Sequence, residues 1–136
     1  MTRQLPPALY HYTCAHQAKG IERDGYVQPH PQLMLRDTAM VWLTDLAPPV
    51  PPMAVGLTNH LVGCDRTEVA YQVHRTGVLP WTEWRNSWVR GQLTQLTPRD
   101  WRQARQAALA LESAPNAMPS HWYIATDRVT IMRRID

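Results

Sequence analysis

The chain has 136 residues, of which 44% are hydrophobic and 18% are charged, and its formal net charge is +3. This length suits one domain with a hydrophobic core, and the composition is typical of folded proteins rather than disordered tails. No run of about 18 apolar residues is present, and the first seven residues lack the apolar core of a signal peptide. We therefore expect a cytoplasmic protein without a membrane partner.

The positive charge comes from thirteen arginines and one lysine. Because the planar guanidinium suits phosphate, this balance permits a nucleic-acid or nucleotide partner without requiring one. The two cysteines, Cys14 and Cys64, have no metal-ligand spacing, and we expect both to remain reduced.

The first predicted element is a strand from about Ala8 to Thr13, which follows a Pro-Pro pair that cannot continue a ladder. Residues 14–24 predict a short helix, with Thr13 as its N-cap and Gly25 as its C-terminal stop. A short extended piece at residues 26–27 and a loop with two prolines then lead to a strand over residues 40–45.

A proline-rich stretch over residues 48–52 favours a stiff extended connection. Alternation over residues 68–74 predicts a strand with three apolar residues on one face, namely Val69, Tyr71 and Val73. The three- and four-residue steps between Trp81, Trp84 and Trp88 predict a short helix or turn with the indoles on one side.

The strongest helix signal runs from Pro98 to about Ser113, with Thr97 as N-cap and Asp100 beside the exposed amides. Arginines 99, 102 and 105 repeat every three residues, which fits either a solvated basic face or a phosphate-binding surface. Two final strands are predicted over residues 121–125 and 129–132. Together these elements predict a single α+β domain over residues 1–136 with five or six short strands.

Several signatures of chemistry are absent from the sequence. It has no Gly-rich phosphate loop, no His-Glu-x-x-His or Cys-x-x-Cys metal spacing, and no Gly-x-Ser-x-Gly nucleophile motif. His11 stands out instead, because an imidazole on a strand must satisfy two nitrogens that leucine does not have. The aromatic residues Trp42 and Tyr71 lie on predicted strands, where core packing alone can explain them.

The order of four segments along the chain indicates a family: Leu9–Thr13 with its central histidine, a helix that ends at Gly25, the aromatic strand Val41–Asp45, and the late segment Trp122–Asp127. In this order they resemble the His-containing branch of the ADP-ribosyltransferase superfamily, which includes poly(ADP-ribose) polymerases, rifampicin ADP-ribosyltransferases and RNA 2′-phosphotransferases. The resemblance covers roughly the first third and the last tenth of the chain. It implies a split β-sandwich that uses NAD as substrate, with no metal.

The resemblance also implies roles for residues on the first two strands. His11 would hydrogen-bond a ribose hydroxyl of NAD, and the Tyr12 backbone would meet the nicotinamide amide. Trp42 would stack on the nicotinamide ring, and Thr13 and Thr44 are expected in the same site. We therefore expect His11 and Trp42 to face each other across a cleft of NAD size.

One departure concerns the late strand, where Trp122 stands at the position of the family's usual catalytic glutamate. Trp122 and Asp127 are the candidate catalytic residues there, and Glu68 and Asp45 are further candidates for the acid. The leading hypothesis is a mono-ADP-ribosyltransferase that acts on a nucleic-acid or protein acceptor. The alternatives are a non-catalytic binding or inhibitor module on the same fold, and phosphate transfer from RNA to NAD.

Overall fold

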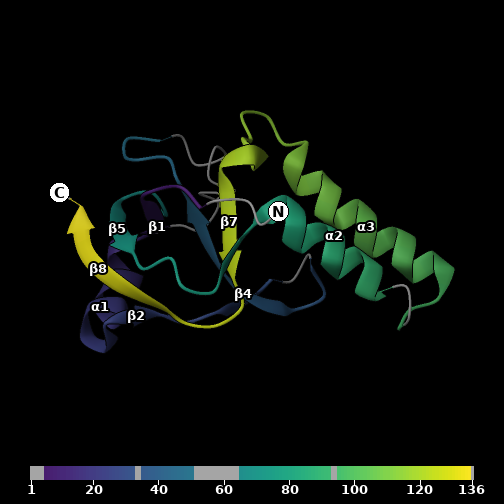
Figure 1. Ribbon diagram of the computed structural model, residues 1–136, viewed down its shortest axis with the longest axis horizontal. Helices are drawn as coiled ribbons and strands as arrows, with labels where there is room; N and C mark the ends of the chain where they lie inside the picture. Colours follow the sequence, from purple (N-terminus) through teal and green to yellow (C-terminus); the bar gives the residue numbers. More distant parts are fainter. Residues whose placement is uncertain (1–4, 33–34, 51–64, 93–94, 136) are drawn as a thin grey trace.

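The computed structural model describes residues 5–32, 35–50, 65–92 and 95–135, which form three α-helices and eight strands (Figure 1). The elements in chain order are β1 (Leu9–Thr13), α1 (Ala15–Asp24), β2 (Tyr26–Val27), β3 (His30–Gln32), β4 (Thr38–Thr44), β5 (Val69–Val73), β6 (Val78–Pro80), α2 (Trp81–Gln92), α3 (Pro98–Glu112), the 3₁₀ turn η3 (Pro119–His121), β7 (Trp122–Ala125) and β8 (Val129–Ile135). The α+β class is confirmed. The expected five or six strands are too few, because β3 and β6, with three residues each, are too short to show a period-2 pattern.

The start of α1 differs from the prediction in its cap. Cys14, rather than Thr13, is the N-cap, and its side chain makes no capping hydrogen bond. Instead, the Ala15 amide donates to the Glu68 carboxylate at 3.1 Å. A carboxylate at the positive end of a helix is favourable, so a distant residue supplies the cap that the local sequence lacks.

The predicted proline loop before residue 40 contains a strand, β3, whose Pro31 lies opposite Ala39 of β4. Proline is tolerated there because β3 is paired on one side only among the described residues, so the missing N–H interrupts no ladder. Cys64 and two of the four prolines of the stretch 48–52 lie outside the described residues, so the expectations about them stay predictions.

The helix ends follow the predicted chemistry. Gly25 closes α1 with a left-handed φ of 81°, which a residue without Cβ adopts readily. The Thr97 hydroxyl accepts a hydrogen bond from the Asp100 amide at 3.3 Å and caps α3. The segment around Trp81, Trp84 and Trp88, for which the sequence predicted either a short helix or a turn, is a helix, α2. Within the described residues, no helix combines the length and hydropathy needed to cross a membrane.

The sheet is antiparallel and consists of two halves. β1 is paired with β5 along its whole length, and β4 is paired with β7 over four residues. By contrast, β1 and β4 share one registered pair, Tyr10 with Thr44. The order β2-β8-β5-β1-β4-β7-β6 is therefore split at its middle, and β1 and β4 form the two edges of the split.

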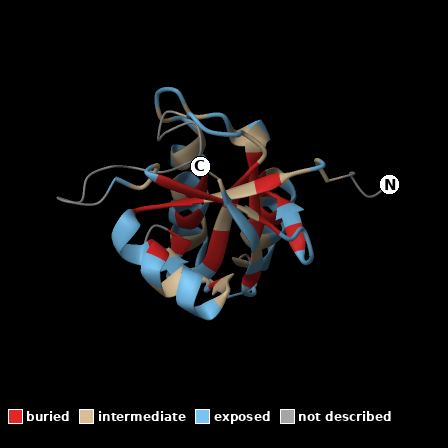
Figure 2. Cartoon of the chain, turned by 90° about the vertical axis from the view of Figure 1, so that its left-hand side faces the viewer, coloured by how far each residue is buried: buried red, intermediate tan, exposed pale blue. Residues whose placement is uncertain are grey.

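Two cores lie on opposite faces of the sheet. The first packs α1 against the sheet and contains Leu9, Ala18, Val41, Leu43, Tyr71, Tyr123 and Val129. The second packs α2 and α3 against the other face and contains Leu35, Met40, Trp81, Trp84, Ala108, Trp122 and Ile124. Figure 2 shows the buried residues concentrated on the strands, whereas the outer faces of the helices are exposed.

Tryptophans dominate the second core. The Trp42 ring lies 5.0 Å from that of Trp81 and 5.8 Å from that of Trp122, measured between centroids. Trp81, Trp84 and Trp88 then stack along α2 at 5.5 and 5.7 Å. The predicted clustering of the three α2 indoles on one side is confirmed, and it anchors α2 to β4 and β7.

Candidate functional site

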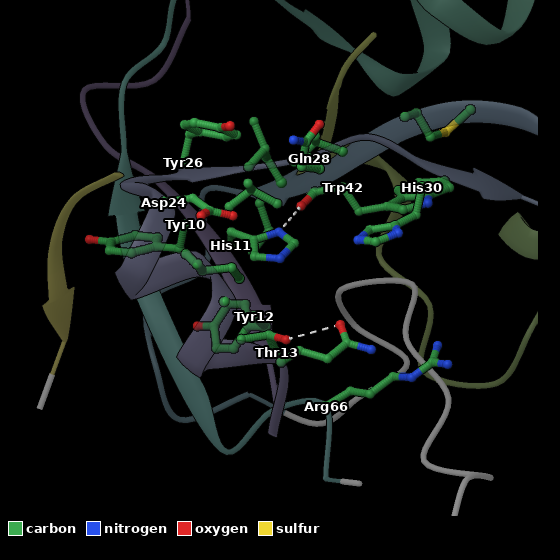
Figure 3. Close-up of a pocket in the computed structure, with 18 of the residues that line it drawn as sticks. Tyr10, His11, Tyr12, Thr13, Asp24, Tyr26, Gln28, His30, Trp42 and Arg66 are labelled. Carbon is green, nitrogen blue, oxygen red and sulfur yellow. Dashed lines mark hydrogen bonds between the residues drawn. The ribbon is translucent and has the colours of Figure 1, made fainter. Parts of the chain in front are cut away.

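The split between β1 and β4 opens into a cavity of about 680 Å³. This volume lies within the range of roughly 300–1,000 Å³ that is usual for small-molecule and cofactor sites. Its walls come from β1, α1, β2, β3 and β4, and Arg66 lies at the edge (Figure 3). The polar residues on the walls include His11, Thr13, His16, Gln17, Asp24, Tyr26, Gln28, His30 and Gln32.

His11 stands at the point where the two strands separate. Its Nδ1 lies 2.9 Å from the main-chain oxygen of Trp42. A carbonyl oxygen can only accept, so Nδ1 carries the proton and Nε2 is left as an acceptor. Figure 3 shows Nε2 turned away from that carbonyl, toward the cavity. The imidazole therefore replaces a ladder hydrogen bond and presents a single acceptor to a ligand.

The charge state of His11 supports this assignment. Burial lowers the pKa of His11, the hydrogen bond to Trp42 raises it, and nearby His30 lowers it further. Burial is the largest of these effects, so the ring is neutral at pH 7. A neutral imidazole with one open acceptor suits a hydroxyl donor better than an anion.

His11 and Trp42 line the same cavity, but the direct contact between them runs through the main chain of Trp42. Leu9, two residues before His11 on β1, packs in the α1 core, whereas Trp42 packs with the α2 tryptophans on the opposite face. His11 therefore meets the main chain of Trp42 and not its ring. Trp42 lines the cavity, and its ring packs at a tilt against Trp81 and edge to face against Trp122.

The other predicted residues of β1 and β4 also line the cavity. Tyr12 is only 5% exposed, and its hydroxyl donates to the Leu46 carbonyl at 2.7 Å, so its side chain is structural. Burial raises its pKa well above the usual range. Thr44 is 1% exposed and accepts from the Leu46 amide at 3.1 Å. Thr13 donates to Gln17 at 3.5 Å, within the cavity wall (Figure 3).

The two predicted residues of the late strand lie elsewhere. Trp122 is 1% exposed within the second core, and Asp127 accepts a hydrogen bond from the Arg128 amide in the turn between β7 and β8. Neither residue is among those that line the cavity. The structure therefore brings His11, Tyr12, Thr13, Trp42 and Thr44 to one site and leaves these two outside it.

The other two proposed acids are engaged away from the cavity. Asp45 lies 2.6 Å from Nδ1 of His121, beyond the closed end of the β1–β4 pair. Glu68 accepts from the first amide of α1. Neither carboxylate lines the cavity, and each one bonds to a partner within the protein.

Sequence reasoning missed the contribution of α1 and of the segment that follows it. His16, Gln17, Gly20, Ile21 and Asp24 all face the cavity. Steps of one, three and four residues place them on one face of the helix, which is the signal that would have found them. Asp24 is the single carboxylate on the wall among the described residues.

The charges on the wall are few. Arg23 holds Asp24 with two hydrogen bonds, at 3.0 and 3.3 Å, and this contact keeps the pKa of Asp24 below its usual range. No cluster of three metal-ligating side chains occurs in the part of the chain that the structure describes. The described wall therefore offers hydrogen bonds and one carboxylate to a ligand, and the guanidinium of Arg66 at its edge.

The chain was compared with known proteins at three levels. No protein-family model matches it, and neither the curated proteins nor the solved structures contain a match to it.

Proposed function

We propose that this protein binds NAD in the cavity between β1 and β4 and transfers its ADP-ribose unit to a nucleic-acid or protein acceptor. The observation that carries the proposal is His11, whose Nδ1 is bonded to the Trp42 carbonyl and whose Nε2 faces the cavity as an acceptor. A ribose offers hydroxyl donors to such an acceptor. The resemblance to ADP-ribosyltransferases likewise implies that a histidine on this strand hydrogen-bonds the ribose hydroxyls.

The shape of the site supports the same ligand. The cavity lies at a break in the sheet, where main-chain groups of two strands reach the ligand without a ladder between them. A nicotinamide carboxamide carries both a donor and an acceptor, so it can pair with such main-chain groups on β1. Because the Trp42 ring already packs against Trp81 and Trp122, we assign the nicotinamide contacts to backbone hydrogen bonds rather than to stacking on this indole.

The reaction needs little covalent chemistry from the protein. The bond between the ribose C1′ and the nicotinamide nitrogen breaks, and both electrons leave with nicotinamide. A lone pair of the acceptor oxygen or nitrogen then bonds to C1′, and the acceptor gives its proton to water. Positioning the ribose and stabilising the positive charge that develops at C1′ supply most of the rate.

Calorimetric titration of NAD tests the binding step. We expect the wild type to bind NAD and His11→Gln to bind it at least about fivefold more weakly, which corresponds to one hydrogen bond of roughly 1 kcal/mol. His74→Ala is a matched control, because His74 is exposed and lies outside this cavity. Circular dichroism of each variant verifies that it is folded.

Two results would contradict the proposal. One is a wild type that gives no binding heat and no thermal shift with millimolar NAD. The other is a folded His11→Gln variant that binds NAD as tightly as the wild type does. A fall in affinity for His74→Ala of the same size would also remove the specific role of His11.

A second candidate is a non-catalytic module that binds NAD or a related nucleotide and does not cleave it. It is favoured by the burial of Trp122 in the second core, since this residue stands where the family has its glutamate. Incubation of the protein with an equal concentration of NAD distinguishes the two candidates. Release of nicotinamide supports the enzyme, and intact bound NAD after many hours supports the module.

A further inference from the structure

Cleavage of a glycosidic bond creates a positive charge on the sugar ring. Enzymes that break such bonds commonly place a carboxylate against the ring to stabilise an oxocarbenium-like transition state. If the cavity binds NAD as proposed, turnover there calls for a negative group near the ribose. The position of the family's usual glutamate holds Trp122, and neither it nor the three candidate acids Asp45, Glu68 and Asp127 line the cavity.

Asp24 is the carboxylate that does face it. It ends α1, and it lines the same cavity as His11 and Tyr26 (Figure 3). Its side chain is 32% exposed, so a ligand can reach it. The chain turns sharply at Gly25 directly after it, which joins the end of α1 to β2 on the cavity wall.

The helix dipole taken alone disfavours a carboxylate at the position of Asp24. The C-terminus of a helix carries a partial negative charge, so an aspartate in the last turn is repelled, whereas a cation there is attracted. Arg23 offsets this repulsion through its two hydrogen bonds to Asp24, and the same contact lowers the pKa of Asp24. A residue that breaks a local rule of stability is often retained for function.

The same arrangement has an electrostatic consequence for the cavity. The Asp24 carboxylate and the negative end of α1 act in the same direction, and both favour positive charge at this wall. The Arg23 side chain is 77% exposed and that of Asp24 is 32% exposed, so solvent screens the charge of Arg23 more strongly.

We infer that Asp24 is a catalytic residue, which stabilises the cationic ribose as the bond from C1′ to nicotinamide breaks. This inference rests on the proposed function. With water as acceptor, a water oxygen bonds to C1′, nicotinamide departs with the electron pair of the broken bond, and the second proton of water goes to the solvent. Asp24 remains a carboxylate throughout and forms no covalent bond.

The test compares NAD binding with nicotinamide release in the full chain. For Asp24→Asn we expect nicotinamide release to fall about 100-fold, as for the loss of one preorganised electrostatic group, while the Kd for NAD changes much less. Asp24→Glu, which keeps the charge, should recover part of the rate. Glu83→Gln removes one negative charge from α2, outside the cavity, and should leave the rate unchanged.

Stability adds a readout that a merely structural role would not give. Asp24→Asn loses an ion pair with Arg23 that is exposed and therefore weak, so it should unfold at a urea concentration close to that of the wild type even though it turns over more slowly. Asp24→Asn with wild-type turnover overturns the inference. So does a wild type that binds NAD and releases no nicotinamide, an outcome that leaves NAD binding intact. A wild type that does not bind NAD at all refutes both the proposed function and the role of Asp24.

Discussion

Replacing Trp122 with glutamate would restore the family's usual acid in the sequence, yet we expect Trp122→Glu to disrupt the fold instead of raising activity. Trp122 is 1% exposed, and its ring lies 5.8 Å from that of Trp42 and 6.0 Å from that of Trp81. A buried tryptophan removes roughly 200 Å² from water, which is worth about 5 kcal/mol at 25 cal/mol per Å².

A glutamate at this position would also bring a carboxylate into the second core, which costs several kcal/mol unless the group is protonated or paired. The sum approaches the 5–15 kcal/mol by which a typical domain of this kind is stable. We therefore expect Trp122→Glu to be largely unfolded without denaturant, whereas Trp122→Phe, which keeps a ring, should lose about 1–3 kcal/mol.

Urea unfolding followed by far-ultraviolet circular dichroism measures both variants, and nicotinamide release from NAD is measured alongside. A folded Trp122→Glu variant with a midpoint near that of the wild type would refute the placement of this side chain in the core. If that variant also released nicotinamide faster than the wild type, Trp122 would have to face the cavity, and the assignment of the acid to Asp24 would lose its basis.

Three further predictions follow from the local chemistry. Burial lowers the pKa of His11, so on acidification the histidine of the unfolded chain is protonated first, and the free energy of unfolding falls as the pH drops below about 6.5. The urea midpoint should therefore fall less steeply between pH 7 and 5 for His11→Gln than for the wild type. Equal slopes would contradict the lowered pKa. Gly25→Ala should lower the free energy of unfolding, measured in urea, by about 1–2 kcal/mol, because φ is +81° there even though the new Cβ would meet no close neighbour. An unchanged midpoint would show that the turn relaxes to accept the side chain. Thr97→Ala should cost about 1 kcal/mol through loss of the cap on α3, and Thr97→Ser should restore it.

Much of the fold could be predicted from the sequence where a pattern was long enough. β5 alternates over five residues, and α3 has a cap, an early proline and a periodic apolar stripe, so both were identified within a few residues. β3 and β6 have only three residues each, too few for a period to emerge. Their positions depend on pairing with β4 and β7, which follow later in the chain.

The candidate site could be predicted in part. Residues of β1 and β4 were found because aromatic and polar side chains on strands are conspicuous. The relative facing of His11 and Trp42 could not be found, because the register between two strands fixes which side chains share a face, and neither strand encodes that register alone. Asp24 was missed because a polar helix face toward a cavity looks in sequence like one toward solvent.

The single pair that joins β1 to β4 also constrains how the chain folds. Strands β1, β2, β5 and β8 build one half of the sheet, and β3, β4, β6 and β7 build the other. The chain therefore passes between the halves four times: from β2 to β3, from β4 to β5, from β5 to β6 and from β7 to β8. Neither half is a contiguous segment that can form first, and such non-local pairing slows folding to the range of milliseconds to seconds. The two walls of the cavity thus arise in one cooperative event, so a break in either half removes the whole binding site at once.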